Sequence, residues 1–527
     1  MLYFPIIVSA FSLIFVFFLN RQIQTQKTLT EANLVTETFQ IIIAFLKRRF
    51  RTVALVAFPL FFILWFIFGF KSGVAFLIGA IASVLAGFVA MTASFQNKEF
   101  PELSFKNGSV AGLSVAGFAL LIVSVFYLLT NDLGALIFLG LGGSLISVFA
   151  RIGKGVFALA TDLFGTNVII LISAMMLAGT LFSADSLLVF LPLVLGATAI
   201  LASIIASFFV RLAKNQNIIL GISVLLTAVG FFPLIKKIVS LASLSLSGNK
   251  IYLVSLMGLV MLAGIFMITE YLASKKHKPV KMVASASQNN QASNIIVGLA
   301  VSMQATVLPG LLICFGILVS FWLAGIYGIA LAAVAMVSLA GMVISIHAFG
   351  NNAKSFADSY AIVSAGLASL VLFFNFSQEL MVSGFKLNFS FNDPRIIVGL
   401  FLGSLIPYLF SFLIITRAGF VSGLILVLTP IAVGFILGPL VLAGVLLGSI
   451  LTGLFLAIFM TLGGSVWSNA RKHIEEGNYG GKDSSAFQAA VVGEAIADPF
   501  KDAVGPGISI LNKAMNIVAL IIVRFLI

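Results

Sequence analysis

This chain has few charged residues, few histidines and a single cysteine. Only 9% of its 527 residues are charged, whereas 61% are hydrophobic and the mean hydropathy is +1.19. An ordinary soluble domain carries about 25% charged residues, so this chain has too little polar surface to cover a soluble globule. The composition therefore excludes a cytosolic enzyme, a nucleic-acid-binding protein and a disordered chain. It indicates an integral protein that crosses a membrane several times.

The single cysteine, Cys314, lies in an apolar run. One cysteine forms no disulfide within the chain and builds no cysteine-based metal site. The net charge is +13, because 30 Lys and Arg residues outnumber 17 acidic residues. In so apolar a chain, these basic residues indicate loops held at a membrane face rather than a surface for nucleic acid.

Long apolar runs recur along the sequence, separated by charged residues or by Gly, Pro and Asn. A helix needs about 20 apolar residues to cross the core of a bilayer. By this measure the sequence predicts an all-α fold with sixteen transmembrane helices in one integral membrane domain, residues 1–527. The expected spans are 2–19, 52–70, 73–93, 109–130, 133–157, 162–182, 186–211, 217–240, 251–273, 294–322, 325–349, 356–377, 395–415, 418–438, 440–462 and 503–526.

The distribution of Lys and Arg predicts the orientation, because basic loops stay on the cytoplasmic side. If the N-terminus lies outside, most of the 30 basic residues fall in cytoplasmic loops, above all in 20–51, 274–293 and 463–502. We therefore expect both termini on the non-cytoplasmic side, with the cell inner membrane as the location.

The one long polar segment, residues 463–502, is predicted to be the main cytoplasmic polar loop. Within it, Glu494, Asp498 and Asp502 follow at intervals of four residues. On a helix this spacing places the carboxylates on one face, where Asp498 and Asp502 could bind a divalent metal ion. The alternative is a solvated, charged helix end that breaks at Pro499. Further candidates are donors and cations for phosphate oxygens, namely Arg151, Asn469, Arg471, Lys472 and Lys501.

Two of the charged residues within the expected spans are candidates for the interior of the membrane. Asp162 begins the sixth span, and Lys513 lies about three turns into the sixteenth. A charge inside a membrane is costly unless it is paired or has a function, so we predict that Asp162 and Lys513 form a buried ion pair. The alternatives are that Asp162 caps its helix and that Lys513 extends to the outer membrane face.

Two motifs near the C-terminus resemble those of the membrane-integral pyrophosphatases. NARKHIEEGNYGGK is followed by GEAIADPFKDAVGP, for which the family form reads roughly GDTVGDPFKDTAGP. Glu494 thus stands where the family has an Asp. Further matches follow in the family's order: GSVAGLSVAGFAL (108–120), FARIGKGV (149–156), TEYLASKKHKPV (269–280), NIIVGLAVSMQATVLP (294–309) and LAGIYGIALAAVAM (323–336). The resemblance covers nearly the whole chain.

This resemblance implies a homodimeric pump with sixteen helices in concentric inner and outer rings. Such pumps couple Mg²⁺-dependent hydrolysis of pyrophosphate to the export of H⁺ or Na⁺. The resemblance also implies that Asp162, in TDLFG, and Lys513 belong to the ion gate. Membrane lipid and a second copy of the chain are the expected partners, another membrane protein is a further candidate, and no nucleic acid is expected.

The sequence departs from the family pattern where the family binds magnesium. The acidic stretch with DVGADLVGK and DNVGDNVGD after the fifth helix is absent, as is the acidic loop before the fourteenth helix. After the eleventh helix, DAYGPIADNAGG is reduced to HAFGNNAKSFAD, with His347 in place of an Asp. Asp358 stands where the family has a lysine, and Ser468 replaces the Asp of WDNAKK.

Hydrolysis of pyrophosphate needs several divalent ions and a water held by a carboxylate. The few remaining carboxylates do not supply these groups, so no catalytic residue is assigned and Mg²⁺ is expected only if a site survives. We interpret the chain as a family member that retains the ion-pump scaffold without most of the hydrolytic centre. It would be a non-hydrolytic membrane assembly, regulatory or transport-related protein. The alternative is an active pyrophosphate-energised proton or sodium pump.

Overall fold

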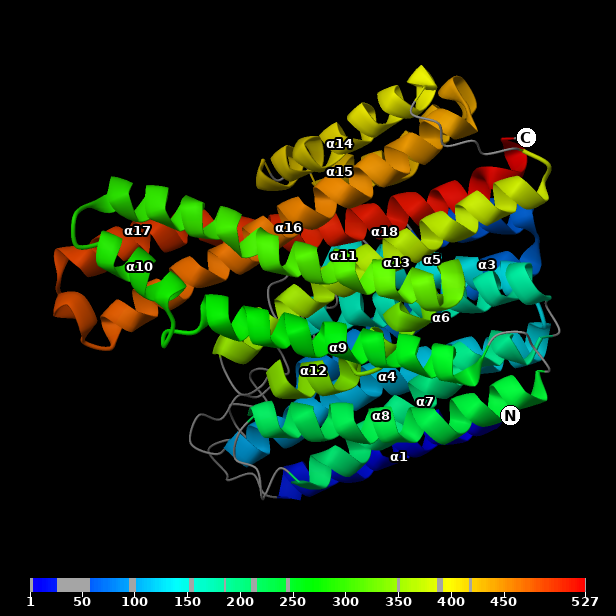
Figure 1. Cartoon of the computed structure of the whole chain (residues 1–527), viewed down its shortest axis with the longest axis horizontal. Helices are drawn as coiled ribbons and strands as arrows, with labels where there is room; N and C mark the ends of the chain where they lie inside the picture. Colours follow the sequence, from blue (N-terminus) through cyan, green and yellow to red (C-terminus); the bar gives the residue numbers. More distant parts are fainter. Residues whose placement is uncertain are drawn as a thin grey trace. The chain divides into compact units, whose positions relative to one another are not determined.

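The structure is a computed structural model that describes most of the chain. The described residues are 3–25, 57–93, 101–150, 156–183, 186–209, 216–242, 247–347, 351–385, 392–416 and 419–526. All regular secondary structure in these ranges is helical (Figure 1). The predicted all-α class is therefore confirmed.

Many of the helices are suited to a membrane. Within the described ranges, twelve are long and apolar enough to cross one. Three shorter apolar helices are Ala57–Phe68, Leu133–Leu145 and Val421–Leu437. One of the twelve long stretches, Gln291–His347, contains the predicted span 294–322 and most of the predicted span 325–349. The total of sixteen spans and their arrangement in two rings stay predictions.

The helices group into two compact units. The first comprises Met1–Leu259 and Val319–Phe349. It holds α1 (Tyr3–Thr25), Ala57–Phe68, α3 (Phe70–Ala93), α4 (Pro101–Thr130), α5 (Leu133–Ala150), α6 (Val156–Phe182), η1 (Leu187–Phe190), α7 (Leu191–Phe208), α8 (Gln216–Leu241), the start of α9 (Gly248–Ala273), the end of α11 (Gln291–Val337) and α12 (Ala340–His347).

The second unit comprises Val260–Leu318 and Gly350–Ile527. It holds the remaining parts of α9 and α11. Its other elements are α10 (Lys278–Ala286), α13 (Asn351–Val382), α14 (Pro394–Ile415), α15 (Gly419–Leu437), α16 (Pro439–Glu475), η3 (Asn478–Gly480), α17 (Ser485–Pro499), η4 (Phe500–Val504), α18 (Gly505–Ile522) and η5 (Val523–Phe525).

A sharp break divides α11. Ala324 has φ −147° and ψ 24°, and Gly325 has φ 62° and ψ −153°, so neither residue is helical. A positive φ is readily adopted by glycine because it has no Cβ. The break falls between the predicted spans 294–322 and 325–349, so the sequence located this boundary correctly.

Close helix crossings depend on glycine in both units. In the first unit, α3 and α5 approach so closely that a Cβ on Gly79 would lie 2.1 Å from the Leu139 carbonyl oxygen. In the second unit, a Cβ on Gly403 of α14 would lie 2.1 Å from the Val445 carbonyl oxygen of α16. Small residues at such crossings allow two backbones to approach, as is typical of helices packed in membranes.

The segment predicted to be the main cytoplasmic polar loop, residues 463–502, is largely helical. α16 continues to Glu475, a glycine-rich turn follows, and α17 and η4 then lead directly into α18. The physical reason is that this segment has its own apolar face, with Trp467 and Ile474 on α16 and Ala490 on α17 all buried in one cluster. Burial of that face stabilises helices that a count of polar residues does not reveal.

Candidate functional site

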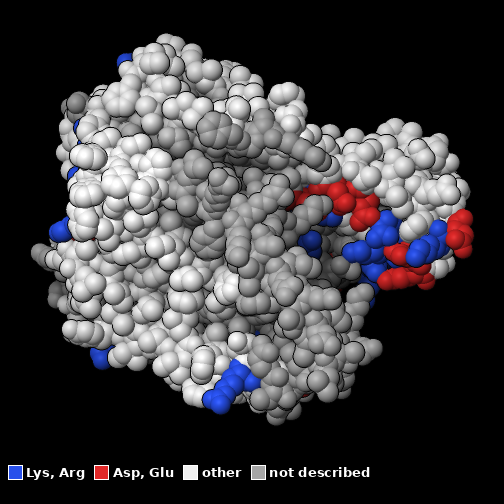
Figure 2. Space-filling model, turned by 180° about the vertical axis from the view of Figure 1, so that it is seen from behind, with Lys and Arg blue, Asp and Glu red and all other residues white. Residues whose placement is uncertain are grey.

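The candidate site lies at one end of the second unit, where α10, the start of α11, the end of α16 and α17 pack together. Figure 2 shows Lys and Arg side chains beside Asp and Glu side chains at this end, on the right of the view. Beneath them lies a shared apolar core, formed by Val280, Val283, Ala284, Val301, Val466, Trp467, Ala470, Ile474, Ala486, Ala490 and Ala497. The core holds the helix ends that carry the charged groups.

Arg471 joins α16 to α17. Its Nη1 donates to Glu475 Oε2 at 2.7 Å, one turn along α16, and its Nε forms an ion pair with Glu494 of α17. The guanidinium also lies 5.8 Å from the centre of the Phe487 ring, within the range of a cation–π contact. Lys482 adds a second cation, 3.6 Å from Glu475. The predicted candidates Arg471 and Glu494 therefore meet each other.

Lys501 engages the second carboxylate of the predicted acidic face. Its ammonium donates to Asp498 Oδ1 at 2.9 Å and to Ser468 Oγ at 2.6 Å. The Lys501 side chain is only 11% exposed, whereas Asp498 is 40% exposed. A charged amine that is this buried and held by two acceptors is fixed in position. Ser468, expected where the family has an Asp, is thus a neighbour of Lys501.

The third carboxylate follows a change in helix type. Glu494 and Asp498 lie on α17, whereas Asp502 lies within η4, which is a π-helical turn. Pro499 has no N–H for an α-helical hydrogen bond, and its ring crowds the preceding turn, so a wider turn is favoured here. The spacing of four therefore does not describe one regular α-helix, and the predicted break at Pro499 is a π-turn instead.

Magnesium prefers carboxylate oxygens and bound water in an octahedral shell. At this end of the unit, Glu494 already has Arg471 and Asp498 already has Lys501 as a partner. A cation bound to a carboxylate competes with a metal ion for the same oxygens, so this donor set does not fit a cluster of magnesium ions. Among the described residues, no group of three or more His, Cys, Asp and Glu side chains could hold a metal ion. The weak metal site at Asp498 and Asp502 stays a prediction.

The other phosphate candidates have separate positions. Asn469 is buried and donates its Nδ2 to the Ala273 carbonyl oxygen at 2.6 Å, so it closes the C-terminus of α9. Lys472 lies on the last turns of α16 and is half-buried. Arg151 lies outside the described residues. A phosphate-binding role for these three residues stays a prediction.

The sequence did not reveal the contacts that fasten the site to its neighbours. Trp467 Nε1 donates to Asn294 Oδ1 at 3.1 Å, and Asn294 Nδ2 donates to Ser287 Oγ at 2.8 Å. Lys275, after α9, forms an ion pair with Glu476 after α16. These partners are far apart in the sequence, and no spacing rule relates them.

The two ion-gate candidates are both fully buried. Asp162 lies in α6 of the first unit and Lys513 in α18 of the second. The expectation that Asp162 begins its helix is wrong, because α6 starts at Val156, about 9 Å earlier at 1.5 Å per residue. Asp162 therefore does not cap α6. The Asp162–Lys513 ion pair stays a prediction.

The fold and the site define a class: a multi-pass helical membrane protein with a charged helical end. The sequence pattern of a family described as Inorganic H+ pyrophosphatase matches residues 10–163, 158–351, 346–420 and 416–522. Together these matches extend over nearly the whole chain. The protein belongs to the membrane pyrophosphatase family, as its motifs predicted.

Several curated relatives resemble the chain over most of its length. A protein of Methanosarcina mazei named "K(+)-insensitive pyrophosphate-energized proton pump" is 30% identical, over 91% of each chain. A protein of Clostridium tetani named "Putative K(+)-stimulated pyrophosphate-energized sodium pump" is 28% identical, over 91% of this chain and 90% of its own. A protein of Chloroflexus aurantiacus, also named "K(+)-insensitive pyrophosphate-energized proton pump", is 28% identical, over 98% of this chain and 92% of its own.

Proposed function

We propose that this protein retains the ion-pump scaffold of its family but has lost most of the Mg²⁺–pyrophosphate hydrolytic centre. It would be a non-hydrolytic membrane protein with an assembly, regulatory or transport-related role. The observation that carries the proposal is the pairing of carboxylates with cations at the charged end of the second unit. Arg471 binds Glu494, and Lys501 binds Asp498.

The chemistry of pyrophosphate makes this pairing significant. Pyrophosphate is strongly anionic, and attack on it requires metal ions that neutralise the phosphoryl oxygens and a carboxylate that orients a water. A site for that reaction needs several carboxylates without internal cation partners. The pairs at Glu494 and Asp498 leave their oxygens engaged with Arg471 and Lys501, so they support loss of the metal cage.

The alignments with the relatives and with the family also support the loss of acidic segments. The alignment with the Methanosarcina mazei protein is 621 positions long, longer than this 527-residue chain. That relative therefore carries segments that this chain lacks. The family match is also divided into four pieces, and neighbouring pieces overlap at residues 158–163, 346–351 and 416–420. Acidic stretches of the family are expected to be missing or reduced at these three places.

The proposal includes the setting of the protein. We infer a homodimer in the cell inner membrane, surrounded by lipid, with both termini on the non-cytoplasmic side. Another membrane protein is a further candidate partner. The distribution of Lys and Arg supports the orientation, and the family supports the homodimer. Cross-linking in native membranes would test the dimer, and labelling of an added terminal cysteine would test the orientation.

The direct test is Mg²⁺-dependent release of phosphate from pyrophosphate by the purified protein in liposomes that contain a pH-sensitive dye. The Methanosarcina mazei relative, prepared in parallel, serves as the positive control. We expect no phosphate release and no dye response from this protein. Any activity that is seen must disappear in the variants Glu494→Gln and Asp498→Asn if it arises at this site. Hydrolysis that these substitutions abolish would overturn the proposal.

A second candidate function is that of an active pyrophosphate-energised pump. The names of the relatives favour it, because they describe proton and sodium pumps that align with about nine-tenths of this chain. The same liposome assay distinguishes the two functions. Repeating it with and without Na⁺ would separate a sodium pump from a proton pump, since only the former depends on Na⁺.

A further inference from the structure

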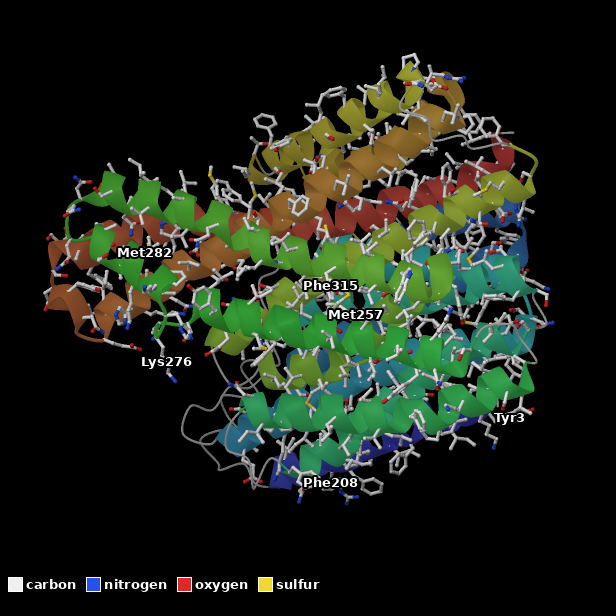
Figure 3. All side chains as sticks on the ribbon, in the orientation of Figure 1. Tyr3, Phe208, Met257, Lys276, Met282 and Phe315 are labelled. Carbon is white, nitrogen blue, oxygen red and sulfur yellow. The ribbon has the colours of Figure 1, made fainter. Side chains whose placement is uncertain are left out.

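A group of exposed lysines lies where α9 leaves the apolar part of the second unit. Lys276 follows the last turn of α9, and Lys278 and Lys281 lie on α10. All three side chains are exposed, and Figure 3 shows Lys276 pointing away from the ribbon. We call these three residues the lysine patch. Lys275 is not part of it, because its ammonium is paired with Glu476.

α10 presents the patch on one side and is anchored on the other. Its residues Val280, Val283 and Ala284 are fully buried in the core shared with α16 and α17. The opposite side exposes Lys281 and Met282, the latter labelled in Figure 3. A short helix with one buried face and a basic face with an exposed apolar side chain is suited to the interface of a membrane.

The residues before the patch are suited to contact with lipid. Met267, nearly two turns before the end of α9, is 70% exposed, and Tyr271 is 41% exposed. The Tyr271 ring lies 5.4 Å from the ring of His277, between Lys276 and Lys278. Tyrosine is enriched where a membrane helix meets the headgroups, because its ring is apolar and its hydroxyl is polar. The patch therefore follows directly after an apolar helix with an interfacial aromatic residue.

The charge of this segment is strongly one-sided. Between Met267 and Gln291 the only acidic residue is Glu270, which is partly buried, whereas four lysines lie within the same stretch. Basic clusters directly beyond a membrane helix attract anionic lipids, and each Lys contributes to that attraction. We propose that the lysine patch binds the phosphate-bearing headgroup of an anionic phospholipid, with Tyr271 and Met282 beside its acyl-chain end.

Native mass spectrometry of the full-length protein in a neutral detergent tests the proposal. The protein is titrated with phosphatidylglycerol and, separately, with phosphatidylcholine that has the same acyl chains. We expect tighter binding of phosphatidylglycerol. Because each lysine near an anionic surface contributes about five-fold to binding, the variant Lys276→Gln/Lys278→Gln/Lys281→Gln should weaken binding by up to about 100-fold. The variant with Arg at the same three positions should retain binding.

The matched control removes the same charge elsewhere. The variant Arg21→Gln/Lys71→Gln/Lys237→Gln replaces three exposed cations at separate places and should bind phosphatidylglycerol as the wild type does. All patch side chains are exposed, so the thermal unfolding midpoint in neutral detergent should be unchanged in both triple variants. Equal binding of the two lipids, or an equal loss in patch and control variants, would overturn the proposal. So would equally tight binding of soluble glycerol phosphate, which would indicate a site for free anions.

Discussion

The Trp467 indole N–H donates to Asn294 Oδ1 across 3.1 Å and joins α16 to α11 inside the charged end of the second unit. Both residues are buried, and Asn294 Nδ2 in turn donates a hydrogen bond to the hydroxyl of Ser287, which follows α10. Three helices that meet at the candidate site are thus linked by one amide side chain. A buried polar group that is fully hydrogen-bonded fixes one arrangement of its neighbours.

The variant Trp467→Phe tests this link. It removes the donor but keeps an aromatic ring, so Asn294 Oδ1 is left buried without its partner. An unsatisfied buried acceptor costs about 1–3 kcal/mol, and loss of ring volume adds to the cost. We expect a lower thermal unfolding midpoint in detergent. Trp322→Phe is the matched control, because Trp322 is 84% exposed, and an equal shift in both variants would contradict the role of the hydrogen bond.

The Arg471–Glu494 ion pair predicts a measurable coupling between α16 and α17. Both side chains are mostly buried, so removal of either partner leaves the other as a poorly solvated charge. In a double-mutant cycle with Arg471→Met and Glu494→Gln, we expect a coupling free energy of about 1–2 kcal/mol. Protection of α17 from hydrogen exchange should fall in either single variant.

A second cycle provides the control for this coupling. Arg524 and Glu379 form an ion pair at 2.9 Å, but Arg524 is largely exposed. Exposed pairs contribute about 0–1 kcal/mol, so Arg524→Met with Glu379→Gln should show a smaller coupling. If the two cycles give the same value, burial of Arg471 does not strengthen its ion pair and the explanation fails.

The crossing of α14 and α16 predicts that Gly403→Ala destabilises the second unit. The added Cβ would lie 2.1 Å from the Val445 carbonyl oxygen, so the backbones must separate. Overpacking of this kind costs about 1–3 kcal/mol, which should lower the thermal unfolding midpoint. Gly423→Ala in α15 is the control: no atom lies within 4 Å of its Cβ, and Ala is favoured over Gly in a helix by up to about 1 kcal/mol. A gain in stability for Gly403→Ala would refute the close crossing.

The sequence predicted the membrane helices well for a simple physical reason. A backbone in lipid must satisfy its own hydrogen bonds, so a long apolar run is nearly always a helix. The apolar runs that form α6 and α18 could therefore be predicted as helices without knowledge of their tertiary contacts. The same argument does not apply to 463–502, because α17 has only 15 residues and carries Glu494 and Asp498, and burial of Ala486 and Ala490 supports its helical state.

The candidate site was predicted in its residues but not in its partners. Spacing rules detect neighbours on one helix, such as Arg471 and Glu475, which are four residues apart. They cannot detect Arg471 with Glu494, which meet only because the chain reverses between α16 and α17. The Trp467–Asn294 bond joins residues 173 positions apart, and no local pattern encodes it.

The predicted pair of Asp162 and Lys513 leads to a charge-reversal experiment. Each residue is fully buried, and an isolated charge in such surroundings costs several kcal/mol unless it is neutralised. Asp162→Lys should therefore lower the thermal unfolding midpoint strongly, because two buried lysines would then repel each other. Adding Lys513→Asp restores opposite charges and should recover much of the loss. The control Asp162→Lys with Lys237→Asp makes the same charge reversal at an exposed lysine and should give no recovery. Absence of rescue by Lys513→Asp would mean that the two residues are not partners.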